Sequence, residues 1–274
     1  MKLPRLSVLV PLVMLGAVLA FTAFGSLLTE HAYDASSLLD RNKPPVFVGG
    51  DWEHPLGTDR LGRDMLARLV VGARISIGLA FLGTVIGLLL GTTLGLLAAR
   101  GNRIVDGAVL ALVDLQAAIP FTIIALATLA IFGSSLALFI AILGVYGWES
   151  YARLVRNSAL SAHRLPFVDA ARVIGVTPMT IDRRHILPTV MNVIIVQATL
   201  NFPQTILLET GLSFLGLGIQ PPLTSLGQLL GEGRDSLSRA WWIAVMPGSL
   251  IFVTTLSISL LGDAIRDWLD PSLS

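Results

Sequence analysis

Long apolar runs divide this chain, and they constrain its fold more than any other feature. A helix needs about 20 largely apolar residues to cross roughly 30 Å of hydrocarbon. Six runs approach or exceed that length, although the fourth is short and ends in Trp148, Glu149 and Tyr151. Its Trp and Tyr fit an interfacial belt. We therefore expect an all-α integral membrane protein with six spans, over residues 8–28, 75–99, 105–132, 136–151, 190–212 and 241–261.

Composition supports a membrane protein and excludes several kinds of chemistry. Only 14% of the residues are charged and 54% are hydrophobic, whereas soluble domains carry about a quarter charged residues. A net charge of +1 gives no sign of a nucleic-acid partner, and the absence of cysteine excludes disulfides and thiol catalysis. Neither lysine, Lys2 nor Lys43, lies in the Gly-Lys-Ser/Thr context of a phosphate-binding loop. Any use of ATP therefore falls to another polypeptide.

The first run allows two interpretations, because Lys2 and Arg5 precede it as in a signal peptide. Its apolar stretch is longer than the usual core of such signals, so we expect a retained span. The chain then divides into residues 1–71, a first span with an external loop, and residues 72–274, a core of five spans with a cytoplasmic tail.

The positive charges predict the orientation. Lysine and arginine number eleven on the side that holds both termini and eight on the other. The loop 153–188 carries six arginines against two acids, which places it in the cytoplasm with both termini. Residues 29–71 and 213–240 are then external.

Small residues recur in the second run at Gly78, Gly83, Gly87, Gly91 and Gly95. Such a stripe lets helix backbones approach closely. We expect tight packing within one bundle, and contact with a second membrane subunit is the alternative.

The cytoplasmic loop reads as a helix–Gly–helix elbow. Pro166 suits a first helical position, Asp169 the first turn and Gly175 a left-handed cap. Thr177 and Pro178 then begin a second helix, and Arg183, Arg184 and His185 are expected at its C-terminal end. An ordinary basic loop is the alternative.

The spacing of this elbow resembles the EAA motif of ABC importer permeases. Asp169-Ala170-Ala171 is followed after three residues by Gly175, and after nine more by His185-Ile186-Leu187-Pro188. Asp169 replaces the family's Glu, and His185 replaces its Ile. The resemblance implies a coupling helix that docks in a groove of an ATPase subunit, with Asp169, Ala170, Ala171, Gly175, Pro178, Leu187 and Pro188 as the coupling residues.

Three further segments resemble the C-type permeases of dipeptide, oligopeptide and nickel importers. They are His54–Arg68 with Gly72–Ser76, then Leu212–Pro222, then Leu261–Pro271. The resemblance implies the type I importer fold, with a B-type permease forming the other half of the pathway. It also implies two ATPase subunits that carry ATP and magnesium, an external substrate-binding protein, and a place in the bacterial inner membrane. Peptides or similar small solutes are the expected cargo, with nickel or opines as alternatives.

The segment before the second span contains Gly57 and Gly62 among the charged residues Asp59, Arg60, Arg63 and Asp64. It suggests a turn that leads into a short amphipathic helix on the external face. That helix would receive the binding protein, or the charges would simply pair within the loop.

Polar residues within the runs are candidates for the translocation path, because such groups usually face a bundle interior or an aqueous cavity. They are Asp114, Gln116, Asn201 and Gln204. Hydrogen bonds between helices are the structural alternative. The four histidines are scattered through loops, so we expect no metal site, no cofactor on this chain and no catalytic arrangement.

Two other functions remain open on the sequence. An ion-driven secondary transporter would show paired ionisable groups at mid-membrane and repeated halves, and neither is evident. A membrane scaffold would have an inert core, against which the four polar candidates argue.

Overall fold

The computed structural model describes residues 6–269, and this part of the chain consists of helices, turns and loops without a β-strand. Lys2 and Arg5, which enter the predicted charge count, lie outside the described residues, as do Asp270 and Pro271 of the C-terminal motif. The all-α fold class is confirmed for the described chain.

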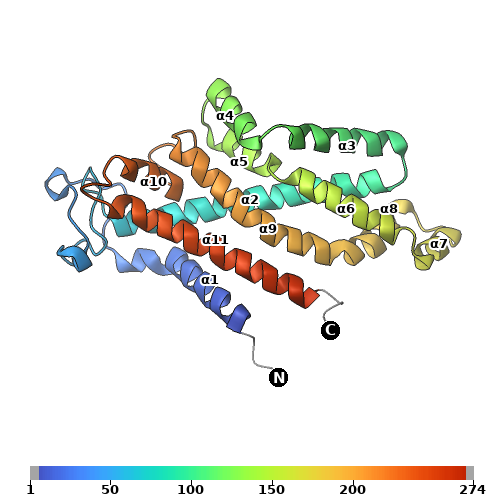
Figure 1. Ribbon diagram of the computed structural model, residues 1–274, viewed down its shortest axis with the longest axis horizontal. Helices are drawn as coiled ribbons and strands as arrows, with labels where there is room; N and C mark the ends of the chain where they lie inside the picture. Colours follow the sequence, from blue (N-terminus) through green and yellow to red (C-terminus); the bar gives the residue numbers. More distant parts are fainter. Residues whose placement is uncertain (1–5, 270–274) are drawn as a thin grey trace.

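Long helices run lengthwise through the molecule, with the short elements gathered at its two ends (Figure 1). Five segments are long and apolar enough to cross a membrane, and a bent pair supplies a sixth if it counts as one span. The helices that build these segments are α1 (Leu6–Phe24), α2 (Met65–Ala99), α3 (Arg103–Ala118), α4 (Phe121–Phe132), α5 (Leu136–Val145), α6 (Trp148–Ala162), α9 (Leu187–Phe214) and α11 (Trp242–Leu269).

The second span begins at Met65, ten residues before the predicted start at Ile75. Asp64 caps the helix, and its side chain accepts a hydrogen bond from the Ala67 backbone N–H at 2.8 Å. The expectation of a separate short amphipathic helix is wrong, because the residues after the turn form the first turns of α2. This helix also crosses the boundary at residue 71 that the sequence suggests.

The third span is broken rather than kinked. Helices α3 and α4 meet at 85°, and Ile119 between them is extended, with φ −118° and ψ 129°. A residue that precedes proline is pushed out of the helical region by the proline ring, so Pro120 explains the break.

The fourth span also differs from the expectation. After α5, Gly147 takes a left-handed conformation (φ +79°), and α6 continues to Ala162 rather than ending near Tyr151. Trp148 and Tyr151 are buried within the chain, so their assignment to an interfacial belt is wrong. Trp148 belongs instead to a hydrophobic cluster with Val109 and Val113 of α3.

The glycine stripe forms the seam between α2 and the α5–α6 pair. A Cβ added at Gly83 would lie 2.8 Å from Leu143 Cβ, and one at Gly91 would lie 2.5 Å from Tyr151 Cβ. Gly87 and Gly95 are equally crowded, by Tyr146 and Ala152. Gly78 has open space and does not belong to the seam. Packing within one bundle therefore accounts for four of the five glycines.

We predict that Gly91→Val destabilises the chain while Gly78→Val does not. A valine at Gly91 would push α6 away from α2, and overpacking of this kind costs about 1–3 kcal/mol. Thermal unfolding of the two variants in the same detergent measures the difference. Equal melting temperatures would show that α2 and α6 are not in close contact.

Candidate functional site

The cytoplasmic loop folds as a helix–Gly–helix elbow. Helix α7 (Pro166–Val173) opens with its proline in the first turn, and Gly175 is left-handed at φ +82°. Thr177 is extended at the N-cap of α8 (Pro178–Ile181), whose first residue is the second proline. These local signals act through the backbone alone, which is why the sequence suffices to place them.

The second helix does not end at the basic residues. A π-helical turn, Asp182–Ile186, joins α8 directly to α9. The expectation that Arg183, Arg184 and His185 close a helix is therefore wrong, and Leu187 and Pro188 lie inside a continuous helical segment. The elbow is thus an extension of a membrane helix rather than a loop attached to it.

A buried carboxylate anchors the elbow to the end of α2. Asp182 is 1% exposed, and Arg100 donates to it from Nε at 2.5 Å. His163 Nε2 lies 3.3 Å from the other carboxylate oxygen. Burial lowers the pKa of His163 below its ordinary value, and the charge of Asp182 opposes that shift. None of these three residues was singled out from the sequence, because they lie far apart along it.

The two alanines of the motif face opposite ways. Ala171 is 8% exposed and packs into this chain's own core with Val155 and Ile181, whereas Ala170 is exposed. Ala170 is therefore open to a partner, whereas Ala171 lies in the core beneath the elbow surface. Two adjacent aliphatic side chains of the elbow are exposed instead, Val173 at 87% and Ile174 at 79%. Asp169 is also on the surface and pairs with Arg172 at 3.2 Å.

Two of the four polar candidates within the spans make hydrogen bonds inside the chain. Gln116 accepts a hydrogen bond from Trp148 Nε1 at 2.6 Å and donates to Glu149 at 2.8 Å, which ties α3 to α6. Asn201 is 2% exposed and accepts from Thr205 Oγ1 at 3.2 Å within α9.

The other two polar candidates lie open on the surface of the isolated chain. Asp114 accepts from Arg153 at 2.8 Å, and their side chains are 71% and 51% exposed. Gln204 is exposed beside a cavity of about 400 Å³ that Phe121 and Tyr146 also line. The structure does not bring the four candidates together in one site.

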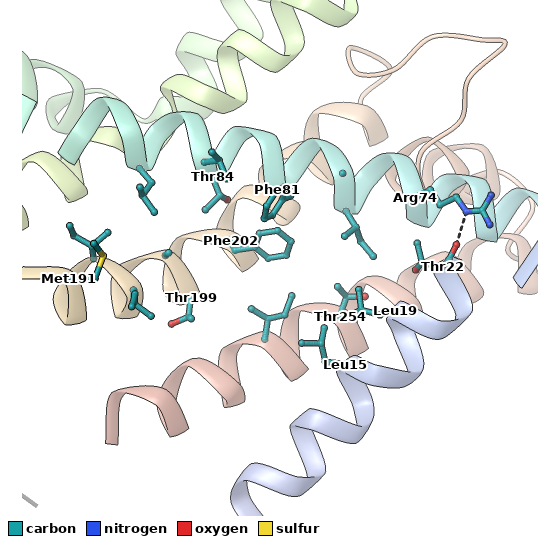
Figure 2. Close-up of a pocket in the computed structure, with 18 residues that line it drawn as sticks. Leu15, Leu19, Thr22, Arg74, Phe81, Thr84, Met191, Thr199, Phe202 and Thr254 are labelled. Atoms are coloured by element: carbon teal, nitrogen blue, oxygen red, sulfur yellow. Dashed lines mark hydrogen bonds between the residues drawn. The ribbon is translucent and has the colours of Figure 1, made fainter. Parts of the chain in front are cut away.

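An apolar groove of about 750 Å³ lies between α1, α2, α9 and α11. Figure 2 shows Leu15, Phe81 and Phe202 directed into it, with Arg74 at one end bonded to the backbone carbonyl of Thr22. None of the polar candidates lines this groove. Its apolar walls suit hydrocarbon and not a hydrated solute.

A buried ion network closes the opposite end of the molecule. Arg68 is 1% exposed and bonds Asp59 at 2.6 Å and Glu232 at 2.7 Å. Arg63 joins the same two carboxylates. Because Glu232 belongs to α10 (Leu226–Arg234), the network ties the segment before α2 to the loop before α11. The alternative of charges that pair within the loop holds for Asp59 with Arg63, whereas Glu232 comes from outside the loop.

Residues 91–274 match the family described as the binding-protein-dependent transport system inner membrane component. The chain belongs to this family. It is therefore a membrane-spanning permease subunit of a binding-protein-dependent ABC importer, and a non-catalytic one. Members of this family work with a partner permease, ATPases and a substrate-binding protein in bacterial membranes.

Curated relatives match this permease over most of their length. It is 37% identical to the glutathione transport system permease protein GsiD of Pectobacterium atrosepticum, over 88% of this chain and 79% of that one. It is 38% identical to the di/tripeptide transport system permease protein DppC of Pseudomonas aeruginosa (84% and 76%). Identity to the oligopeptide transport system permease protein OppC of Escherichia coli is 34% (95% and 85%).

Solved structures support the fold. An inward-facing MetNI methionine ABC transporter chain superposes with a TM-score of 0.58 at 23% identity, covering 75% of this permease and 98% of that chain. A chain of an amino acid ABC transporter with histidines gives 0.56 at 18% identity, covering 73% and 94%. The type I importer permease fold is confirmed.

We predict that Arg68→Met strongly destabilises this permease. Removal of its buried cation leaves Asp59 and Glu232 with Arg63 as their one remaining partner in the network, and breaking a buried ion network costs about 3–5 kcal/mol. The matched control is Arg60→Met in the same segment, because Arg60 is exposed and lies 3.9 Å from its nearest acid, Asp235. Thermal unfolding and membrane abundance measure both effects. A melting temperature of Arg68→Met equal to that of Arg60→Met would mean that the network adds nothing to stability.

Proposed function

We propose that this permease forms half of a translocation pathway for peptides or similar small solutes. We also propose that its elbow couples ATP hydrolysis on the ATPase subunits to the membrane helices. A homologous B-type permease would form the other half. Two ATPase subunits would carry ATP and magnesium, and an external binding protein would deliver the solute. Relatives named for di/tripeptides, oligopeptides and glutathione support the peptide class over nickel or opines.

The apolar surface of the elbow is the observation that carries the coupling role. Val173 and Ile174 are nearly fully exposed on a polar, arginine-rich segment. Adjacent exposed aliphatic side chains are unfavourable in water, and they suit a hydrophobic groove on another protein. The ion pair between Arg100 and Asp182 holds this surface against the end of α2. A movement of the elbow would therefore be passed on to the membrane helices. Asp169, Ala170, Gly175 and Pro178 would shape the docking surface, whereas Ala171, Leu187 and Pro188 would support it.

Asp114 and Gln204 are the residues that we assign to the pathway, because their side chains are exposed in the isolated subunit. Gln116 and Asn201 keep the structural role that their hydrogen bonds supply. Exposed polar groups on apolar helices suit a water-filled cavity between two permease subunits. The ion-driven alternative lacks support, since Asp114 pairs with an arginine at the surface instead of with a buried acid.

The orientation that we propose places the elbow in the cytoplasm and the Arg68 network outside. The two lie at opposite ends of the long helices (Figure 1). The chain contains no cysteine, so single cysteines can report each side. We predict that Ser36→Cys reacts with a membrane-impermeant maleimide in intact cells, and that Ser161→Cys reacts only after permeabilisation. Both serines lie on surfaces, in the external loop and near the elbow respectively. Reaction of Ser161→Cys in intact cells would reverse the orientation.

The coupling role predicts a selective effect at the elbow. Ile174→Asp places a charge on the docking surface without touching the core of this permease, so insertion and pairing with the sister permease should be unchanged. We expect at least a tenfold loss of ATPase subunits retained on purified membranes. Hydrolysis stimulated by peptide-loaded binding protein should fall with it.

The matched control is Leu39→Asp, since Leu39 is 97% exposed at the opposite end of the molecule. It should retain the ATPases and their stimulation. Gly175→Val supplies a second variant, because a β-branched residue at φ +82° disturbs the turn. If both Ile174→Asp and Gly175→Val retain the ATPase subunits and their stimulation at the wild-type level, the elbow is an ordinary loop without a coupling role.

A further inference from the structure

Two histidines that are 23 positions apart in the sequence meet in the external segment. The rings of His31 and His54 have centroids 4.6 Å apart, tilted by 40°. One ring nitrogen of each and a carboxylate oxygen of Glu53 lie within 4.8 Å of one another. The expectation of scattered histidines is therefore wrong for this pair. Two imidazoles and one carboxylate form a ligand set that borderline divalent metals prefer.

A buried carboxylate orients the central histidine. Asp64 Oδ1 lies 3.0 Å from His54 Nδ1, and the two side chains are 0% and 5% exposed. With the proton on Nδ1 and donated to Asp64, the lone pair is on Nε2, the other ring nitrogen. Metal-binding histidines are held in this way by a carboxylate behind the ring, which fixes the tautomer and raises the basicity of the ligand nitrogen. The orienting group is built independently of any metal, because Asp64 also caps α2.

We propose that His31, Glu53 and His54 bind one divalent transition-metal ion of the zinc class on the external face, with His54 bonding through Nε2. Three protein ligands leave one tetrahedral position for water or for a group from another molecule.

The site needs only a small contraction to close on a metal. Bonds of about 2.0–2.1 Å in tetrahedral geometry place ligand atoms about 3.3 Å apart, against the limit of 4.8 Å here. His54 is fixed by its burial, whereas Glu53 is 61% exposed and His31 half-buried, and both lie outside helices. The two outer ligands can therefore move toward the fixed one.

The charges near the site allow Glu53 to change partners. Lys43 Nζ lies 3.7 Å from Glu53, but it is closer to Asp40 at 2.8 Å and to Asp51 at 3.4 Å. Lys43 therefore still has two carboxylate partners when Glu53 binds a metal cation instead. The site then holds one ligand carboxylate with the Asp64 carboxylate behind it, and this negative charge favours a dication.

A metal here would link the chain that leaves α1 to the turn that enters α2. Thr29 already bridges the two by donating to Asp64 Oδ2 at 3.3 Å, and it accepts from the His31 backbone N–H at 3.2 Å. Binding to the folded segment alone stabilises it by mass action. We therefore expect zinc to protect the external segment, including Arg41 and Lys43, from trypsin.

The test uses the full chain, free of any histidine tag, in lipid nanodiscs. Zinc affinity is measured by competition with a chromophoric chelator, and stoichiometry by metal analysis after gel filtration. We expect one zinc per chain, and more than a tenfold loss of affinity in His31→Ala, whose ring lies outside the buried His54–Asp64 pair. Asp64→Asn keeps a good helix cap and should lose 10–100-fold through the orienting contact.

The matched control is His185→Ala, since His185 is exposed at the elbow, where its ring lies 5.8 Å from that of Phe167. Its zinc affinity should equal that of the wild type. Far-ultraviolet circular dichroism and gel filtration confirm that each variant is folded. Less than stoichiometric zinc on the wild type, or a His31→Ala affinity equal to that of the wild type, would overturn the site. A loss in His185→Ala as large as in His31→Ala would overturn it too.

Discussion

The close approach of α2 to α5 and α6 is the constraint on which the rest of this permease depends. Gly83, Gly87, Gly91 and Gly95 let backbones meet where any side chain would collide. Lipid tails are as apolar as leucine, so hydrophobic burial does little to hold helices together inside a membrane. Close packing must supply the attraction instead. With α2 fixed against α6, the helices α3 and α9 pack against this pair.

Helix α2 also connects the two ends at which we propose that this permease meets other molecules. Its 35 residues span about 52 Å at 1.5 Å per residue. Its N-terminal end holds the Asp64 cap and the buried Arg68 network, and its C-terminal cap, Arg100, holds Asp182 under the elbow. In the orientation that we propose, an external binding event and an internal hydrolysis event would act on opposite ends of this one helix. That arrangement suits an importer whose energy source and solute lie on different sides of the membrane.

Prediction from sequence succeeded where a local rule decides the backbone. Pro166, Gly175 and Pro178 fix the elbow through φ alone, so its form could be read directly. Prediction failed where a residue contacts a partner that is distant in the sequence. Helix α2 begins before the predicted residue because Arg68 pairs with Glu232, which is 164 residues away. A hydropathy count cannot predict that this charge is compensated. By its sequence, Trp148 resembles an interfacial anchor, but in the structure its indole N–H donates a hydrogen bond to Gln116 on another helix.

The sequence by itself determined the membrane spans, the small-residue seam, the elbow and, through its motifs, the family. Each of these rests on apolar length, on residue size or on the dihedral limits of glycine and proline, which act within a few residues. The tertiary structure alone decided that Ala171 faces inward while Val173 and Ile174 face outward. It also decided that Gln116 ties α3 to α6, that Asn201 is buried and bonded within α9, and that His31 meets His54. These outcomes depend on which side chains meet across long stretches of chain, and only the packed helices settle that.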